Sequence, residues 1–230
     1  MPIAIVTGAS KGFGRALALD LAADGWDLVI DARHASELAL VAEEIAERGA
    51  RVTAVAGDVT DPAHRAALVA AAGQYGALHL LVSNASALGP SPRPELADYP
   101  LDELRRVLEV NVLAPLALAQ AALEALRASR GVVVAISSDA AVEPYAGWGG
   151  YGSSKAALDH LHRVLGVEEP DLRVYAFDPG DMRTDMHQAA FPGEDISDRA
   201  TPESVVPALR ALVESGRPSG RYAAGDVVSA

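Results

Sequence analysis

Three side chains in the second half of the sequence have the types and spacing needed for proton transfer. Tyr151 and Lys155 stand four residues apart in a segment that predicts a helix, so their side chains lie on one face of it. An ammonium beside a phenol favours the phenolate and lowers the phenol pKa from about 10 toward a value useful for acid–base catalysis. Ser137 and Ser138 follow an apolar, β-branched run, so a hydroxyl there is expected to face the same cleft. The alternative is that Tyr151 and Lys155 are an exposed pair on a helix surface with no catalytic role, and the nearby serines make this interpretation the weaker one.

A fourth candidate lies inside a long predicted helix. Asn111 is a mediocre helix former, and Pro115 follows four residues later. Because proline has no N–H, the carbonyl of Asn111 loses its helical partner, and we expect a kink there with a water molecule as the replacement donor. A kink that serves only packing is the alternative.

The elements that must position these residues alternate along the whole chain between short apolar runs and longer helical patterns. Strands are expected at residues 3–7, 28–32, 52–56, 78–83, 131–137, 172–178 and around 222, and helices at 15–23, 36–48, 63–72, 101–128, 151–165 and 202–215. Ser36 is expected to cap the second helix, and Asp61-Pro62 the third. Such alternation predicts βαβ units and a parallel sheet buried on both faces. We therefore expect an α/β protein with a single doubly wound Rossmann-type domain over residues 1–230, formed by a seven-stranded parallel sheet with helices on both faces.

A glycine-rich turn follows the first expected strand. It reads Thr7-Gly8-Ala9-Ser10-Lys11-Gly12-Phe13-Gly14 and leads into a helix. Gly8 allows a tight turn, Gly12 lets the backbone approach a pyrophosphate, and Gly14 lets the helix pack closely on the sheet. The helix N-terminus then offers free N–H groups to phosphates. An ordinary βα turn is the alternative, whereas a Walker P-loop is excluded because no Gly-Lys-Ser/Thr closes the motif.

Together these motifs resemble the short-chain dehydrogenase/reductase family from end to end. The spacing of Ser138, Tyr151 and Lys155 is that family's spacing, and it selects Ser138 over Ser137. Asn111 stands where the family places its fourth catalytic residue. Three further segments look like family motifs, namely Asp58-Val59, Ser83-Asn84-Ala85-Ser86 and Pro179-Gly180-Asp181-Met182-Arg183-Thr184. Ser83 and Ser86 depart from the family pattern, and this departure concerns the geometry of the loop rather than the proton chemistry.

The resemblance implies a carbonyl–alcohol oxidoreductase that transfers a hydride at a nicotinamide. Ser138 would donate a hydrogen bond to the substrate oxygen, Tyr151 would protonate it, and Lys155 would lower the phenol pKa and bind the nicotinamide ribose. The freed carbonyl of Asn111 would hold a water that relays protons to Lys155. The implied cofactor-binding residues are Gly8, Ser10, Lys11, Gly12, Phe13, Gly14, Arg33, Asp58, Val59, Asn84, Tyr151, Lys155, Pro179, Gly180, Met182 and Thr184.

The end of the second expected strand bears on the choice between NADP and NAD. An acidic residue there usually binds the 2′-hydroxyl of NAD, whereas a nearby arginine binds the 2′-phosphate of NADP. The sequence reads Asp31-Ala32-Arg33, and by resemblance the discriminating acidic position falls on Ala32. Arg33 and Lys11 therefore favour NADP(H) over NAD(H). The alternative is that Arg33 only pairs with Asp31.

Composition excludes several classes of function. With 19 basic and 31 acidic residues the net charge is −12, which repels phosphate backbones and anionic membranes, so we expect no nucleic-acid or membrane partner. The absence of cysteine removes thiolate nucleophiles and Cys-ligated metals, and the six histidines show no ligand spacing, so no metal site is expected. No leader pattern opens the sequence, and we expect a cytoplasmic protein.

Two functions from different classes remain, a reductase of small-molecule carbonyl compounds and a catalytically silent dinucleotide-binding sensor or regulatory subunit. An intact set of four catalytic residues favours the reductase. Substrate identity would depend on the loops 87–100 and 180–201, with bulky candidates at Met182, Met186, His187 and Phe191. Trp148 is either a wall of the substrate pocket or helix-entry packing. By resemblance, Ala-rich helix faces imply a homodimer or homotetramer.

Overall fold

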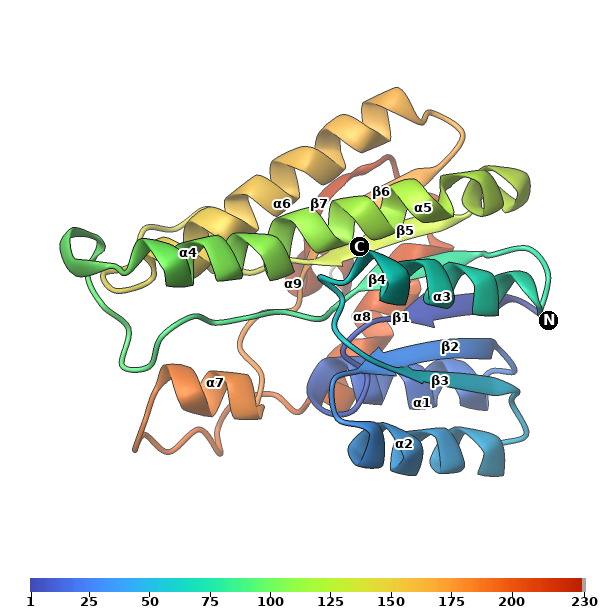
Figure 1. Ribbon diagram of the computed structural model, residues 1–230, viewed down its shortest axis with the longest axis horizontal. Helices are drawn as coiled ribbons and strands as arrows, with labels where there is room; N and C mark the ends of the chain where they lie inside the picture. The colour runs from blue at the N-terminus through green and yellow to red at the C-terminus, as the bar shows by residue number, and fades with distance from the viewer. Residues whose placement is uncertain (229–230) are drawn as a thin grey trace.

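The computed structural model describes residues 1–228, and in this part of the chain seven parallel strands form one sheet in the order β3-β2-β1-β4-β5-β6-β7 (Figure 1). The strands are β1 Ile3–Val6, β2 Asp27–Ala32, β3 Val52–Ala56, β4 Leu80–Ser83, β5 Val132–Ile136, β6 Arg173–Asp178 and β7 Gly220–Ala223. The order reverses between β1 and β4, where open α/β sheets bind ligands. The predicted doubly wound α/β fold is confirmed. The last two residues of the predicted domain, 229 and 230, lie outside the described residues.

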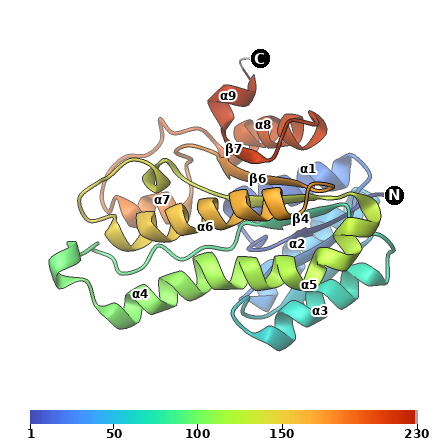
Figure 2. The ribbon, with the colours of Figure 1, turned by 90° about the horizontal axis from the view of Figure 1, so that it is seen from above.

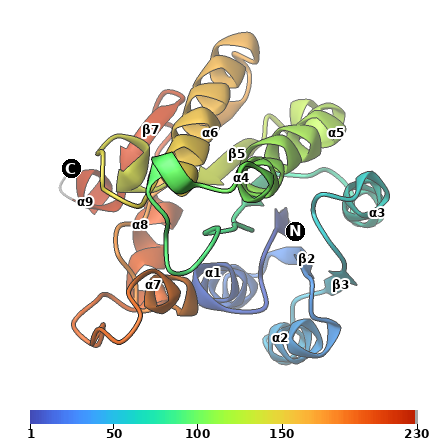
Figure 3. The same ribbon diagram turned by 60° about the vertical axis from the view of Figure 1, so that its left-hand side comes forward.

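Helices cover both faces of this sheet (Figure 3). They are α1 Gly12–Ala23, α2 Ala35–Glu47, α3 Pro62–Gly73, α4 Leu101–Leu108, α5 Ala114–Ser129, α6 Gly149–Glu168, α7 Asp185–Ala190, α8 Pro202–Glu214 and α9 Ala224–Val228. Alternate residues of each strand point to opposite faces, so Ala4 and Val6 pack with α1, α2 and α8, while Ile3 and Ile5 pack with α3, α5 and α6. The two apolar clusters hold the carboxyl ends of the strands at one common edge.

Two helix starts differ from the sequence expectation. Helix α2 begins at Ala35, so Ser36 lies inside the helix and the prediction that it is the cap was wrong. The N-cap residue is His34, whose side chain makes no capping bond within the described residues. Helix α1 begins at Gly12, inside the glycine turn rather than after it. Asp61 caps α3 as expected, because its carboxylate accepts from the Ala63 N–H at 2.9 Å.

The long helix predicted over residues 101–128 is interrupted by a π-helical turn. The turn spans Glu109–Leu113, and the Ala114 N–H donates to the carbonyl of Glu109, five residues back. Pro115 cannot donate to Asn111, and the wider turn accommodates this missing bond. Figure 2 shows α4 and α5 continuing in one direction beside α6.

Residues 101–129 are also long and apolar enough, by length and composition alone, to cross a membrane. In the fold, however, the apolar residues of α5 pack on the sheet. Leu118, Ala122 and Leu126 are at most 1% exposed and belong to the core. This packing accounts for their hydrophobicity.

Helix α7 stands apart from the two helical layers, beyond the carboxyl ends of the strands (Figure 1). It lies within the long segment 180–201, which the sequence analysis treated as a loop. Thr184 caps it, because its hydroxyl accepts from the His187 N–H at 3.2 Å. The loop 87–100 contacts this helix, since the Ser91 hydroxyl donates to the carbonyl of Ala189 at 3.1 Å.

Candidate active site

A cleft of about 920 Å³ opens at the carboxyl edge of the sheet. It brings together the glycine turn, the loop after β4, the serines after β5, the start of α6 and the segment after β6. Of the residues predicted from the sequence, those that line it are Gly8, Ser10, Lys11, Gly12, Phe13, Arg33, Asp58, Val59, Asn84, Ser138, Tyr151, Lys155, Pro179, Gly180, Met182 and Thr184. Gly14 and Asn111 are buried and support the cleft from behind its wall.

Tyr151 and Lys155 both project from the first turns of α6 and are buried. The Lys155 Nζ donates to the carbonyl of Ile136 at 2.7 Å and lies 5.5 Å from the centre of the Tyr151 ring. Burial lowers the pKa of Lys155 to about 8, while the carboxylate of Asp159 acts in the opposite direction. The lysine is therefore a cation at neutral pH and loses its proton in mildly alkaline solution.

The pKa of Tyr151 corrects an expectation from the sequence. Burial raises it well above the ordinary value of a phenol, and hydrogen bonding with the hydroxyls of Ser86 and Ser138 only partly opposes this. The prediction that Lys155 lowers this pKa below the ordinary range does not hold, because loss of water around the buried phenol, together with the nearby carboxylates of Asp178 and Asp139, raises the pKa. Tyr151 is therefore a protonated phenol throughout the neutral range, which suits a proton donor.

Ser138 lies at the end of β5, where the chain turns toward α6. Its hydroxyl donates to the Asp139 carboxylate at 2.9 Å and accepts from the Ala140 N–H at 3.2 Å, which caps the short helical turn that follows. The pair of bonds fixes the hydroxyl beside Tyr151. Both serines line the cleft, but Ser137 is buried, whereas Ser138 is partly exposed.

Asn111 uses its side chain in a way that the sequence did not indicate. Its Oδ1 accepts from the Ala87 N–H at 2.7 Å and from the Ser86 hydroxyl at 3.2 Å. Its Nδ2 donates to the carbonyl of Ala87 and to the Ser154 hydroxyl, both at 2.9 Å. Fully buried, Asn111 thus clamps the loop after β4 to α6, one turn from Tyr151.

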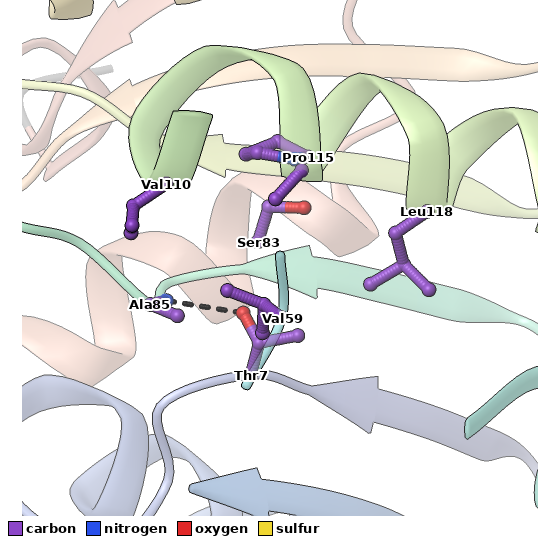
Figure 4. Close-up of a pocket in the computed structure, with 8 residues that line it drawn as sticks. Thr7, Val59, Ser83, Ala85, Val110, Pro115 and Leu118 are labelled. Carbon is purple, nitrogen blue, oxygen red and sulfur yellow. Dashed lines mark hydrogen bonds between the residues drawn. The ribbon is translucent and has the colours of Figure 1, made fainter. Parts of the chain in front are cut away.

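A small cavity of about 10 Å³ lies between β4 and the π-helical turn, lined by residues that include Ser83, Val110 and Pro115 (Figure 4). This volume matches roughly one water molecule. The Ser83 hydroxyl is buried there without a hydrogen-bond partner among the described residues. Beside it, the Thr7 hydroxyl accepts from the Ala85 N–H at 3.0 Å, which fixes the start of the loop (Figure 4).

The glycines of the first turn are required at their positions for different structural reasons. Gly8 and Gly12 have φ of 64° and 56°, a region that favours glycine. A Cβ on Gly14 would lie 2.4 Å from the Asn84 Nδ2 and 2.6 Å from the Gly8 carbonyl oxygen, so α1 could not pack so closely with any larger residue. A Cβ on Gly12 would meet only Thr184, at 3.5 Å and beyond, so this backbone faces the cleft.

Asp31, at the end of β2, is bound within the protein rather than exposed to a ligand. Its Oδ1 accepts from the Gly8 N–H at 2.7 Å, and its Oδ2 lies 2.9 Å from the His64 Nε2. Both side chains are buried. His64 is not among the residues predicted from the sequence, although an aspartate inside a buried strand is a signal that a polar partner is needed.

Arg33 and Lys11 occupy the rim of the same cleft. Both carboxylate oxygens of Asp31 have other partners, so the structure does not support the alternative that Arg33 serves to pair with Asp31. Arg33 is exposed and lies near Asp58, whose pKa is lowered chiefly by the Thr60 N–H. Lys11 is exposed and forms a 2.9 Å ion pair with Asp185 at the start of α7.

Aromatic side chains form the end of the cleft next to Tyr151. The Trp148 ring lies 5.7 Å from that of Tyr151 and 5.8 Å from that of Phe191, and the Phe191 ring lies 4.8 Å from that of His187. The Arg93 guanidinium stacks on Trp148 at 3.9 Å. Trp148 therefore has both of the roles considered for it, because it lines the cleft and also packs at the start of α6.

Among residues 1–228, no group of three or more His, Cys, Asp or Glu side chains is arranged to hold a metal ion. The arrangement instead offers a buried phenol, a buried ammonium and a serine hydroxyl beside a backbone turn open to phosphates. Such a set can protonate an oxygen that gains negative charge while a dinucleotide lies along the cleft.

The chain is similar in sequence and fold to known proteins. A family model described as short chain dehydrogenase matches residues 2–195. Sepiapterin reductase of Mus musculus is 36% identical over 201 residues, covering 82% of this chain and 77% of the reductase. A solved short chain dehydrogenase of Shigella flexneri complexed with NADP has a TM-score of 0.90 at 30% identity, covering 97% of each chain. A 7α-hydroxysteroid dehydrogenase complexed with NADH has a TM-score of 0.88 at 28% identity, covering 96% of this chain and 92% of its own.

Proposed function

The chain belongs to the short-chain dehydrogenase/reductase family and is an NAD(P)-dependent oxidoreductase, and on that premise we propose that it reduces a small ketone or aldehyde with NADPH. The observation that supports this most is the convergence of Ser138, Tyr151 and Lys155 on the cleft that also contains the glycine turn. Relatives named as reductases and dehydrogenases add to it.

The fit of a dinucleotide is supported by the shape of the backbone. Gly12 leaves open space on the cleft side, and α1 begins after Lys11, which makes no side-chain capping bond in the described chain. The first N–H groups of α1 are therefore free to bind a pyrophosphate. The residues of the Pro179–Thr184 segment would contact the nicotinamide end.

The proposed chemistry divides between cofactor and protein. When bound, the cofactor supplies a hydride to the carbonyl carbon. Tyr151 donates its phenolic proton to the carbonyl oxygen, and the Ser138 hydroxyl, which donates to Asp139 in the free protein, turns to donate a hydrogen bond that stabilises the charge developing there. Lys155 stabilises the phenolate that remains and binds the ribose, while Asn111 positions the loop that contains Ser86.

Preference for NADPH is supported by the charges at the end of β2. Asp31 is held by Gly8 and His64, so its carboxylate is not free to bind a ribose 2′-hydroxyl. Ala32 offers no carboxylate, and Arg33 and Lys11 remain at the rim as cations for a 2′-phosphate. Because one relative is complexed with NADP and another with NADH, the fold alone does not decide between them.

We also propose that the protein is a homodimer or homotetramer. Leu113 before α5 and Val164 and Val167 on α6 are large apolar side chains exposed at the surface of this chain, which favours a subunit contact there. Light scattering at several concentrations tests this, and a monomer at every concentration would contradict it.

The function is tested by NADPH oxidation with a panel of ketones, aldehydes and 3-oxo compounds. We expect turnover with the wild-type protein, and a loss of about 10²- to 10⁴-fold in kcat for Tyr151→Phe with an unchanged Kd for NADPH. Tyr75→Phe is the matched control, because Tyr75 bonds to Thr53 and does not line the cleft.

Two outcomes would overturn parts of this proposal. NADPH binding without turnover on the whole panel would favour the sensor, the second function considered from the sequence. Full activity of Tyr151→Phe alongside an active wild type would show that the proton comes from another group.

A further inference from the structure

Arg221, on the edge strand β7, contacts three parts of the active site from behind. Its Nε donates to the Asp159 Oδ2 at 3.0 Å, and its Nη2 donates to the carbonyl of Ser138 at 3.0 Å and to the Asp178 Oδ2 at 2.7 Å. Both carboxylates are more than nine-tenths buried, and the arginine side chain is 24% exposed. These bonds fix the guanidinium in one orientation.

Each partner of Arg221 is joined to a residue of the proposed reaction. Ser138 is the proposed hydrogen-bond donor to the substrate oxygen. Asp178 accepts from the Gly180 N–H at 3.0 Å with its other oxygen, so it holds the segment expected to contact the nicotinamide. Asp159 lies one turn after Lys155 on α6, and its carboxylate raises the pKa of that lysine.

The charges of this group are balanced. Lys155 and Arg221 supply two cations and Asp159 and Asp178 two anions, all behind the phenol of Tyr151. Around them face Asp139 from the turn after β5 and His162 from α6, together with the hydroxyls of Ser86, Ser137 and Ser138. Without Arg221, the Lys155 cation would stand alone against the carboxylates of Asp159 and Asp178.

We propose that Arg221 is a positioning residue of the active site, which aligns Ser138 and the Gly180 segment with each other through one guanidinium. This proposal rests on the proposed function, because it concerns the same serine and the same cofactor segment. A purely structural role, joining β7 to α6, predicts lower stability alone. A positioning role predicts in addition a loss of kcat and a change in the pH profile.

The test compares Arg221→Met and Arg221→Lys with Arg173→Met. Arg173 is the matched control because it also lies in the sheet, at the opposite end of β6, and the hydrogen bond of its guanidinium is to the carbonyl of Val213, outside the cleft. For Arg221→Met we expect kcat to fall by about 10²-fold, as for a small misplacement of reacting groups. Arg221→Lys restores part of this, since it keeps one cation and fewer bonds.

The pH profile gives a readout that stability alone does not move. In Arg221→Met the Asp159 carboxylate loses the cation that opposes it, so we expect it to raise the pKa of Lys155 further and to shift the alkaline limb of kcat to higher pH by about half a unit or more. Arg221→Lys and Arg173→Met should keep the wild-type limb. Unchanged kcat and an unchanged limb in Arg221→Met would overturn the inference, and if that variant does not fold, Arg221→Lys with wild-type kcat would overturn it.

Amide hydrogen exchange separates this inference from the proposed function. Arg221→Met should increase exchange in segments 137–142 and 178–184, whereas Arg173→Met should not. If the wild type turns over no carbonyl compound but this increase is found, the proposed reaction fails and the positioning of both segments stands. No increase in either segment would overturn the inference whatever the wild-type activity.

Discussion

The His64 Nε2 lies 2.9 Å from the Asp31 Oδ2, and the other oxygen of this carboxylate accepts from the backbone N–H of Gly8. The side chains are 5% and 1% exposed. A histidine of α3 is thereby connected to the glycine turn after β1 through a single carboxylate. Gly57 makes room for this contact, because a Cβ there would lie 2.3 Å from the His64 Nδ1.

His64→Ala should weaken both folding and cofactor binding. It leaves a buried carboxylate without its partner, which typically costs about 2–4 kcal/mol of unfolding free energy. The Gly8 turn then has a less fixed anchor, so the KM for NADPH should rise. Denaturant unfolding and steady-state kinetics measure the two effects. His160→Ala, at an exposed histidine outside the cleft, is the control, and equal stability of both variants would contradict the prediction.

Arg33→Ala should shift the cofactor preference toward NADH. Loss of a charge-assisted bond to a 2′-phosphate reduces kcat/KM with NADPH by about 10- to 100-fold, while the value with NADH stays nearly constant. Arg48→Ala, at the far end of α2, should leave the ratio unchanged. A wild-type protein that already prefers NADH would reverse our choice of cofactor.

Lys155→Met should abolish turnover and yet stabilise the fold. The pKa of Lys155 is about 8 in the folded protein and 10.5 in the unfolded chain, so burial of the ammonium costs up to about 3 kcal/mol at pH 7. Between pH 8 and 10.5 the unfolded chain holds the extra proton, so wild-type stability rises with pH there and the advantage of Lys155→Met shrinks. Unfolding at pH 7 and pH 10 measures this. Lys11→Met, at an exposed lysine, is the control, and equal stability of the two variants at both pH values would contradict the prediction.

His162 should make the protein sensitive to acid. Burial lowers its pKa to about 4, from an ordinary value of 6.5, and its Nδ1 bonds to the carbonyl of Leu158. As pH falls from 6.5 to 4, His162 becomes protonated in the unfolded chain but stays neutral in the folded protein. The free energy of unfolding therefore declines by up to about 3 kcal/mol.

His162→Leu should therefore flatten the change in urea midpoint between pH 7 and pH 4.5. His160→Leu is the matched control, because His160 is exposed two residues earlier on the same helix. If the urea midpoint changes between pH 7 and pH 4.5 as much in His162→Leu as in His160→Leu, other groups cause the acid sensitivity.

The parallel sheet, the glycine turn and the spacing of the site residues can all be predicted from the sequence. Each depends on local information: β-branched runs between helical patterns set the parallel strands, and a separation of four residues places Tyr151 and Lys155 on one helical face. Helix boundaries do not follow from this local information, as at Ser36, because capping depends on the path of the preceding chain.

The folded structure alone shows which side chains far apart in sequence meet. Asp31 and His64 are 33 residues apart, Asn111 and Ser154 are 43 apart, and Arg221 and Ser138 are 83 apart. It also decided the direction of the Tyr151 pKa, which the sequence analysis took from its neighbour Lys155 alone. The physical reason is common to both: burial and non-local hydrogen bonds are properties of the packed chain, and no periodicity along the sequence encodes how much water a phenol loses.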